Sequence, residues 1–180
     1  PFFCTHYGFG ADDEGPAWQR IEPDWWAMAE ELALHLDDDT NNTSLVLAIE
    51  IESDKSVLLF AGDAQAGNWL SWHDVTFANE NGASGQPITG TDLLRRTVLY
   101  KVGHHGSHNA TLREKGLEMM QNPELVAMLP VDEDQAKVKG WAMPFPPLLE
   151  RLNQKTRGRV IRADSGLPQK PESVPAAEWK

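Results

Sequence analysis

Three histidines lie within five positions, directly after the apolar run 97–102. His104, His105 and His108 follow Gly103, which ends that run. An imidazole held at the rim of a sheet can bind a divalent metal or contact a substrate. The run predicts a buried strand that delivers these side chains to such a rim. A loop whose histidines make ordinary local hydrogen bonds is the alternative.

A carboxylate stands at the end of a second predicted strand. The apolar run 56–61 is followed by Gly62 and Asp63. A carboxylate in this position is free to coordinate a cation. Gly-Asp is also an ordinary turn pair, so Asp63 alone would be interpreted as a turn residue. Two polar strand ends in one small domain favour a metal or substrate site, which Ser107 extends.

The other histidines carry weaker signals. His35 falls beside a helical apolar stripe, and His73 lies near the end of a short predicted helix. Both positions are typical of structural histidines, although His73 is close in sequence to Asp63. A mononuclear metal site completed by His73 or His108 is therefore a further alternative.

Strands and helices alternate along the chain, which predicts a layered α/β domain. Apolar, β-prone runs predict strands over 44–51, 56–61, 97–102, 126–131 and 159–162, the first two forming a hairpin. Helical spacing predicts helices from residue 23 to about 36 and over 64–73, 91–96, 110–121 and 144–155. Asn109 is expected to cap the helix over 110–121.

The remaining segments are expected to be irregular. Residues 78–90 are rich in Asn, Gly and Ser and predict a loop. Residues 1–22 show no periodicity, and the tail 166–180 is expected to be loose. The domain itself is therefore expected to span 23–165. Trp69 and Trp72 are expected in the core or in the wall of a pocket.

Composition excludes several classes of function. The 180 residues fit one domain, and a 41% hydrophobic content supports a packed core. The formal net charge of -11 disfavours broad binding to nucleic acid or to anionic membranes, although a local cationic pocket remains compatible. No apolar run reaches the ~18 residues that span a bilayer.

The cysteine content points to a reducing compartment. Cys4 is the single cysteine, which excludes an internal disulfide and favours a cytoplasmic location. Cys4 and His6 lack a second pair of ligands that would complete a metal site. The chain starts without Met or a signal-peptide pattern, so a fragment or a processed product is expected.

In combination, the two strand ends resemble the carboxy-terminal half of a metallo-β-lactamase-fold hydrolase. The matching segments are 42–47, 58–63 and 102–107, within a similarity that runs from about residue 41 to about residue 131. They resemble the subgroup that includes the hydrolase domain of the DNA-uptake channel protein ComEC. The resemblance implies a layered αββα fold, of which only the carboxy-terminal βαβ half with extra helices is expected here.

The resemblance also implies a binuclear metal centre. Asp63 would bridge two metals and one histidine of the pair would bind the second, with His105 preferred because a glycine follows it. His104 would then be a neighbouring ligand or a substrate contact, and Ser107 and His108 would contact the substrate. Zinc is the expected metal and manganese the alternative. The metals would hold a hydroxide that attacks an ester, a phosphoester or an amide, and the subgroup narrows this to phosphodiesters.

One departure from the family is large. The first ligand cluster of the family, His-x-His-x-Asp-His, is absent from the sequence. Asp63 and one imidazole are fewer than the three or four protein ligands of a zinc site, so the chain alone is expected to be inactive and to bind metal weakly or not at all. The expected partners are the missing amino-terminal half, a small-molecule or phosphoester substrate, and a second copy through the uncovered sheet face. A non-catalytic protein-interaction domain that keeps relic strand ends is the rival interpretation.

Overall fold

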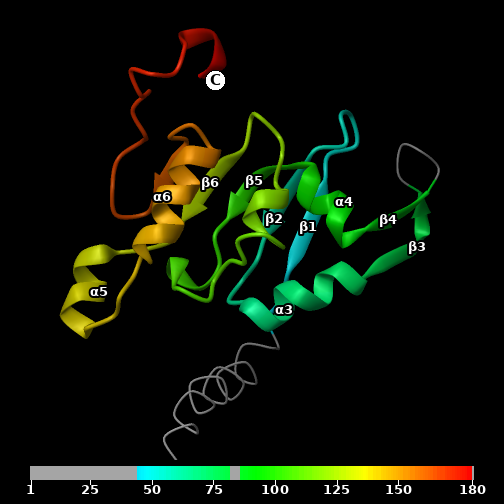
Figure 1. Ribbon diagram of the computed structural model, residues 1–180, viewed down its shortest axis with the longest axis horizontal. Helices are drawn as coiled ribbons and strands as arrows, with labels where there is room; N and C mark the ends of the chain where they lie inside the picture. The colour runs from blue at the N-terminus through cyan, green and yellow to red at the C-terminus, as the bar shows by residue number, and fades with distance from the viewer. Residues whose placement is uncertain (1–43, 82–85, 180) are drawn as a thin grey trace, which may run out of the picture. The chain divides into compact units, whose positions relative to one another are not determined.

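A five-stranded mixed sheet is the centre of the computed structural model, which describes residues 44–81 and 86–179 (Figure 1). The strand order is β1-β2-β5-β6-β7. The strands are β1 (Leu47–Glu50), β2 (Val57–Phe60), β5 (Thr97–Lys101), β6 (Val126–Leu129) and β7 (Val160–Arg162). β1 pairs with β2 in an antiparallel hairpin, and β2, β5, β6 and β7 are mutually parallel. The predicted α/β class and its five strands are confirmed.

Four α-helices lie in the described part of the chain. They are α3 (Ala66–Ser71), α4 (Gly90–Arg95), α5 (Glu133–Lys139) and α6 (Pro146–Lys155). A capping box between Thr89 and Asp92 begins α4, and prolines in the first turn begin α6, where their missing N–H groups cost nothing. The predicted helices over 64–73, 91–96 and 144–155 are confirmed. None of the helices in the described ranges is long and apolar enough to cross a bilayer.

The predicted helix over 110–121 is wrong. This segment contains turns and a single 3-10 turn, Leu117–Met119. The chain is folded so tightly here that a Cβ on Gly116 would lie 2.4 Å from the Leu112 carbonyl oxygen and 3.0 Å from the ring of Trp69. Tertiary packing against the core has overridden the local helical pattern. Asn109 consequently caps no helix.

The predicted loop over 78–90 is wrong at both of its ends, while residues 82–85 lie outside the described part of the chain. β3 (Thr76–Asn81) and β4 (Pro87–Thr89) form a separate two-stranded antiparallel sheet. Backbone ladder hydrogen bonds can form whatever the side chains are, so the Asn-rich and Gly-rich composition hid the pairing. The first expected segment, 1–22, and the expected helix from residue 23 lie outside the described residues.

The tail after residue 166 is not loose along its whole length. Val174 is buried, and the Lys170 ammonium donates to its carbonyl at 2.8 Å. A Cβ on Gly158 would lie 2.7 Å from Pro171, so this part of the tail packs against the turn before β7.

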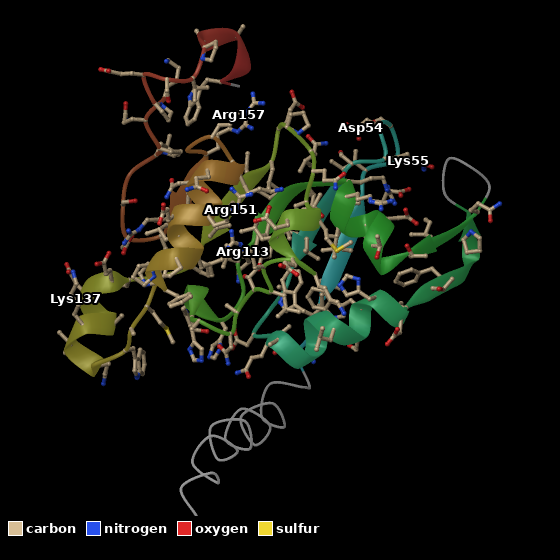
Figure 2. The ribbon with its side chains drawn as sticks, viewed as in Figure 1. Asp54, Lys55, Arg113, Lys137, Arg151 and Arg157 are labelled. Carbon is tan, nitrogen blue, oxygen red and sulfur yellow. The ribbon has the colours of Figure 1, made fainter. Side chains whose placement is uncertain are left out.

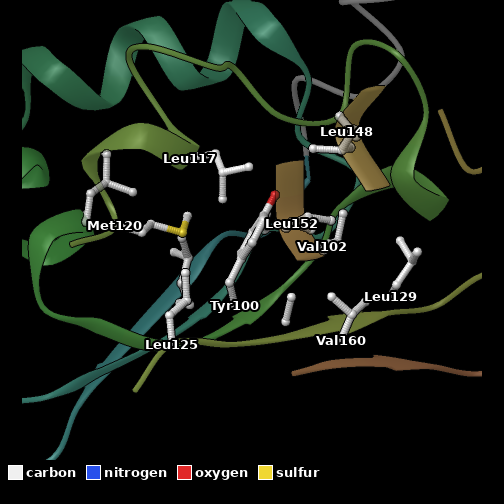
Figure 3. Close-up of a cluster of buried hydrophobic side chains, with 14 of the residues drawn as sticks. Tyr100, Val102, Leu117, Met120, Leu125, Leu129, Leu148, Leu152 and Val160 are labelled. Carbon is white, nitrogen blue, oxygen red and sulfur yellow. The ribbon is translucent and has the colours of Figure 1, made fainter. Parts of the chain in front are cut away.

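One face of the sheet carries the hydrophobic core (Figure 3). Leu59, Tyr100, Ala127 and Val160 are register partners across four strands, and all are buried. Leu148 and Leu152 of α6, spaced i and i+4, belong to the same cluster and are labelled in Figure 3.

The opposite face is apolar except for Lys101, and it is only partly covered. Leu47 and Ile49 of β1 are register partners of Phe60 and Leu58 and are 45% and 49% exposed; Met128 of β6, on the same face, is 39% exposed. From β2 to β7 the order of the strands in the sheet follows their order in the chain. Right-handed crossovers in that order place the connecting segments on one face, which leaves the other without them.

An ion-pair cluster joins α5 to the end of β7. Arg162 donates to Asp164 at 2.8 and 2.7 Å and to Glu133 at 2.8 Å. The backbone N–H of Glu133 also donates to Asp164, at 2.9 Å. The hydrogen bonds from Arg162 lower the pKa of Asp164 to about 2.

This lowered pKa predicts a pH dependence of stability. The folded carboxyl has a lower pKa than the unfolded one, so its contribution is present above pH ~4 and is lost as the pH falls through about 2. Asp164→Asn is expected to cost about 1–2 kcal/mol at pH 7, after allowance for solvent screening. Urea unfolding measured from pH 7 to pH 2 should show the difference between wild type and variant shrinking towards pH 2. A difference that stays constant over this range would contradict the prediction.

Candidate functional site

The ends of β2 and β5 meet directly. The backbone N–H of His104 donates to the carbonyl of Gly62 at 3.1 Å. A Cβ on Gly103 would lie 2.9 Å from that same carbonyl oxygen, so the approach requires a glycine there. The two polar segments predicted from the sequence therefore follow neighbouring parallel strands at one edge of the sheet. Ligands in parallel sheets bind at this carboxyl edge.

Asp63 lies at this edge with a free carboxylate. Its backbone N–H donates to the hydroxyl of Ser44 at 3.2 Å, which joins the turn after β2 to the segment that precedes β1. The side chain is exposed, and its oxygens have no hydrogen-bond or ion-pair partner within the ranges 44–81 and 86–179. It is therefore accessible to a cation or a ligand.

The histidine pair lies in a turn with unusual backbone geometry. His104, His105 and Gly106 have φ values of 42°, 53° and 71°, so three consecutive residues are left-handed. For a residue with a side chain this conformation costs about 1–2 kcal/mol. Two backbone hydrogen bonds hold the turn, from Gly106 N–H to Gly103 and from Ser107 N–H to His104, at 2.9 and 3.0 Å. Strain of this kind is concentrated at functional sites.

A hydrogen-bond chain orients the ring of His104. Ser107 donates its hydroxyl proton to Asn109 Oδ1 at 2.7 Å, so its oxygen accepts from His104 Nδ1 at 3.1 Å. His104 is thereby the Nδ1–H tautomer, and Nε2 carries the lone pair. Nε2 has no hydrogen-bond partner in the described part of the chain. This arrangement presents the lone pair to a metal or to a proton.

Gln65 is the other neighbour of this ring. Its side chain is 1% exposed, and Nε2 lies 3.4 Å from His104 Nδ1. Its Oε1 is buried without a partner among the residues described. Rotating the Gln65 amide by a half-turn exchanges its oxygen and nitrogen. Oε1 would then lie beside the Nδ1–H group of His104 and accept a hydrogen bond from it.

The ring of His105 has a different environment. Its Nδ1 donates to the carbonyl of Pro130 at 2.7 Å, just after the end of β6, and the ring is exposed. Since β6 and β2 lie on opposite sides of β5, His105 lies towards β6, whereas His104 contacts Gly62 and Gln65 after β2. These contacts favour His104 as the neighbour of Asp63, whereas the family resemblance favours His105 as the metal ligand.

The two residues expected to contact substrate lie in different places. Ser107 is only 4% exposed and holds the ring of His104, which makes it a positioning residue. His108 is exposed and packs edge-on against Phe145, with ring centroids 6.4 Å apart. Both rings line a cavity of about 270 Å³.

His73 does not complete a metal site. Its Nε2 lies 2.7 Å from the carbonyl oxygen of Lys115, and its Nδ1 lies 3.3 Å from the hydroxyl of Thr91. Both ring nitrogens thus contact neighbouring segments, which fits the structural role predicted for this histidine. Trp69 is fully buried in the core, and Trp72 lines a separate apolar cavity of about 520 Å³. His35, His6 and Cys4 lie outside the described residues.

The described ligands do not complete a metal site. Within residues 44–81 and 86–179, no group of three or more His, Cys, Asp or Glu side chains could hold a metal ion. Asp63 and His104 supply two donors from adjacent strand ends, and a structural or catalytic zinc takes at least three from protein. A metal held here would need further ligands from outside these ranges.

Sequence reasoning missed two residues of the site. Gln65 gave no signal beyond its position two residues after Asp63. Asn109 was interpreted as a helix cap, although the structure uses its side-chain oxygen to fix the hydroxyl of Ser107. Both residues position His104 and do not themselves offer a metal ligand, so their residue types did not mark them as functional.

Comparisons with known proteins gave no relatives. No model of a protein family, no curated protein and no solved structure matches this chain.

Proposed function

We propose that this sheet edge is part of the metal centre of a hydrolase with a metallo-β-lactamase-type fold. The observation that supports the proposal best is the hydrogen bond from His104 N–H to the Gly62 carbonyl, which joins the two polar strand ends. Asp63 and His104 Nε2 would bind the metal, zinc or manganese, with His105 as the second candidate ligand. The remaining ligands would come from outside the described residues.

A divalent metal bound there would supply Lewis-acid activation of water for the hydrolysis of an ester, a phosphoester or an amide. The chain's own residues prepare the site. Ser107 and Asn109 hold His104 as the Nδ1–H tautomer, and the left-handed turn separates the two imidazoles. The Pro130 carbonyl orients His105 in the way that backbone carbonyls orient metal-binding histidines.

Calorimetric titration with zinc and with manganese tests the proposal. We expect weak binding to the chain and a loss of affinity of about tenfold or more in Asp63→Asn, because a charged ligand is removed. Ser107→Ala should lower the affinity by about tenfold while Ser107→Thr retains it, since threonine keeps the hydroxyl. Asp134→Asn is the matched control, because Asp134 is fully exposed on α5 and makes only a 3.9 Å contact with Lys137. Equal affinities of Asp63→Asn and Asp134→Asn would contradict the proposal.

A second candidate is a non-catalytic domain that pairs with another copy of itself. The partly covered sheet face favours it, because Leu47 and Ile49 are about half exposed on the edge strand β1. Sedimentation of the same samples separates the two candidates. A dimer that dissociates in Ile49→Lys, in a protein whose metal affinity is insensitive to Asp63→Asn, would support the interaction domain.

A further inference from the structure

A cavity next to the histidine turn has mixed basic and apolar walls. Its volume is about 270 Å³, and the lining includes His108, Arg113, Leu117, Phe145, Leu148 and Arg151. We call it the His108 cavity. The backbone N–H of Phe145 donates to the Gly106 carbonyl at 2.8 Å, so one wall of the cavity is fixed directly to the turn that carries His104 and His105.

Three cations and two carboxylates lie in or beside the wall of the His108 cavity. Arg151 donates to both carboxylate oxygens of Glu118, at 2.5 and 2.6 Å. Figure 2 labels Arg151 and Arg113, the two arginines of the cavity wall. Arg113 is 3.7 Å from one of these oxygens and Lys155 is 3.8 Å from the other, so three cations share this carboxylate.

Glu118 lies beside the cavity, whereas Glu150 lines it and accepts a hydrogen bond from Gln154. The side chain of Arg113 is 79% exposed, so it is the cation that a ligand can reach. In a chain with a net charge of -11, Arg113 is an accessible cation that can attract an anion locally.

The apolar wall and the volume restrict the ligand. Leu117 and Leu148 are buried core residues, and the ring of Phe145 meets His108 edge-on at 6.4 Å. A volume of about 270 Å³ is slightly below the roughly 300–1,000 Å³ of typical ligand pockets, so only a small ligand fits. The cavity accommodates one ring or a short aliphatic group, with room for a single anionic group.

We propose that the His108 cavity binds the non-reacting end of a substrate, namely a small apolar group that carries a carboxylate or a phosphate. Arg113 pairs with the anion through its guanidinium fork, which matches both groups. Phe145 and Leu148 pack against the apolar part. The inference rests on the proposed function, because the cavity borders the turn that holds the candidate ligands.

Binding of simple probes to the EDTA-treated protein tests this inference. Phenylphosphonate and benzoate carry the two anions on the same ring, and benzyl alcohol is the neutral control. By calorimetry or NMR titration, we expect both anions to bind at least tenfold more tightly than the alcohol. Arg113→Gln should weaken the binding of the preferred anion by about tenfold and leave the alcohol unchanged. The stronger of the two anions identifies the group that the cavity prefers.

Two controls separate the possible failures. Arg95 is exposed at the end of α4 and does not line the cavity, so Arg95→Gln should leave probe binding unchanged. Asp63→Asn should also leave it unchanged, because the probes bind without metal. Equal binding of anion and alcohol, or no effect of Arg113→Gln, would overturn the inference. The proposed function would then still be tested separately, by the metal titration. Since Arg113 is exposed, its substitution leaves the core intact, and circular dichroism verifies that the variant is folded.

Discussion

Trp69→Ala is expected to lower the free energy of unfolding by about 3–5 kcal/mol. Trp69 is fully buried and lies 4.3 Å from Trp72 and 5.9 Å from Tyr100, measured between ring centroids. Its indole N–H donates to the Ala110 carbonyl at 3.0 Å. The substitution therefore removes the largest fully buried side chain of the described residues and leaves a cavity. It also removes the hydrogen bond that holds the segment after His108.

Urea unfolding followed by far-UV circular dichroism measures this loss without relying on tryptophan fluorescence. Trp69→Phe keeps a ring but removes the donor, so a loss of about 1–3 kcal/mol is expected from the unsatisfied Ala110 carbonyl. Trp141→Ala is the matched control, because Trp141 is 56% exposed, and its effect should stay within about 0.5 kcal/mol. A loss in Trp69→Ala no larger than that of Trp141→Ala would show that Trp69 is not a core residue.

Gly90→Ala is expected to destabilise the fold by about 1–3 kcal/mol, although it adds only one methyl group. A Cβ at this position would lie 2.1 Å from the carbonyl oxygen of Trp72. Backbone atoms cannot rotate away as a side chain can, so the start of α4 or the turn after α3 has to move. The Gly90 N–H also donates to the Val75 carbonyl at 3.2 Å, which joins the same two segments.

Thermal unfolding measures this effect as a decrease of several degrees in Tm, at about 2–4 °C for each kcal/mol in a chain of this size. Gly166→Ala serves as the control, since a Cβ there has no atom within 4 Å. The two variants make the same chemical change, so their difference isolates the clash. Similar melting temperatures for both would contradict the close approach of α4 to the turn after α3.

Most of the fold was predictable from the sequence because its signals are local. Apolar runs that end in turn residues gave all five strands of the main sheet, and the prolines gave the start of α6. α5 was not predicted, although the sequence carries residues typical of both helix ends. Asp132 caps the start by accepting from the Gln135 N–H, and Gly140 ends the helix at a φ of 72°. The segment 110–121 was mispredicted because its conformation depends on contacts with Trp69, a residue that lies far from it in the sequence.

The candidate site was predictable only in part, for a related reason. The glycines that end two apolar runs indicated where polar side chains leave the sheet, and the structure brings those two strand ends together. The choice between His104 and His105 depends on which neighbour each ring meets, Ser107 or Pro130, and those contacts follow from the direction of the turn. No local pattern encodes that direction.

The left-handed turn at His104 and His105 limits which substitutions at these two positions give interpretable results. Asparagine, aspartate and glycine adopt positive φ with the smallest penalty, whereas β-branched residues are strongly disfavoured there. An alanine scan of this pair would therefore mix a backbone penalty with the loss of an imidazole. Asparagine at either position removes the ring and leaves the turn geometry accessible, so it separates the chemistry of these side chains from the shape of the chain that carries them.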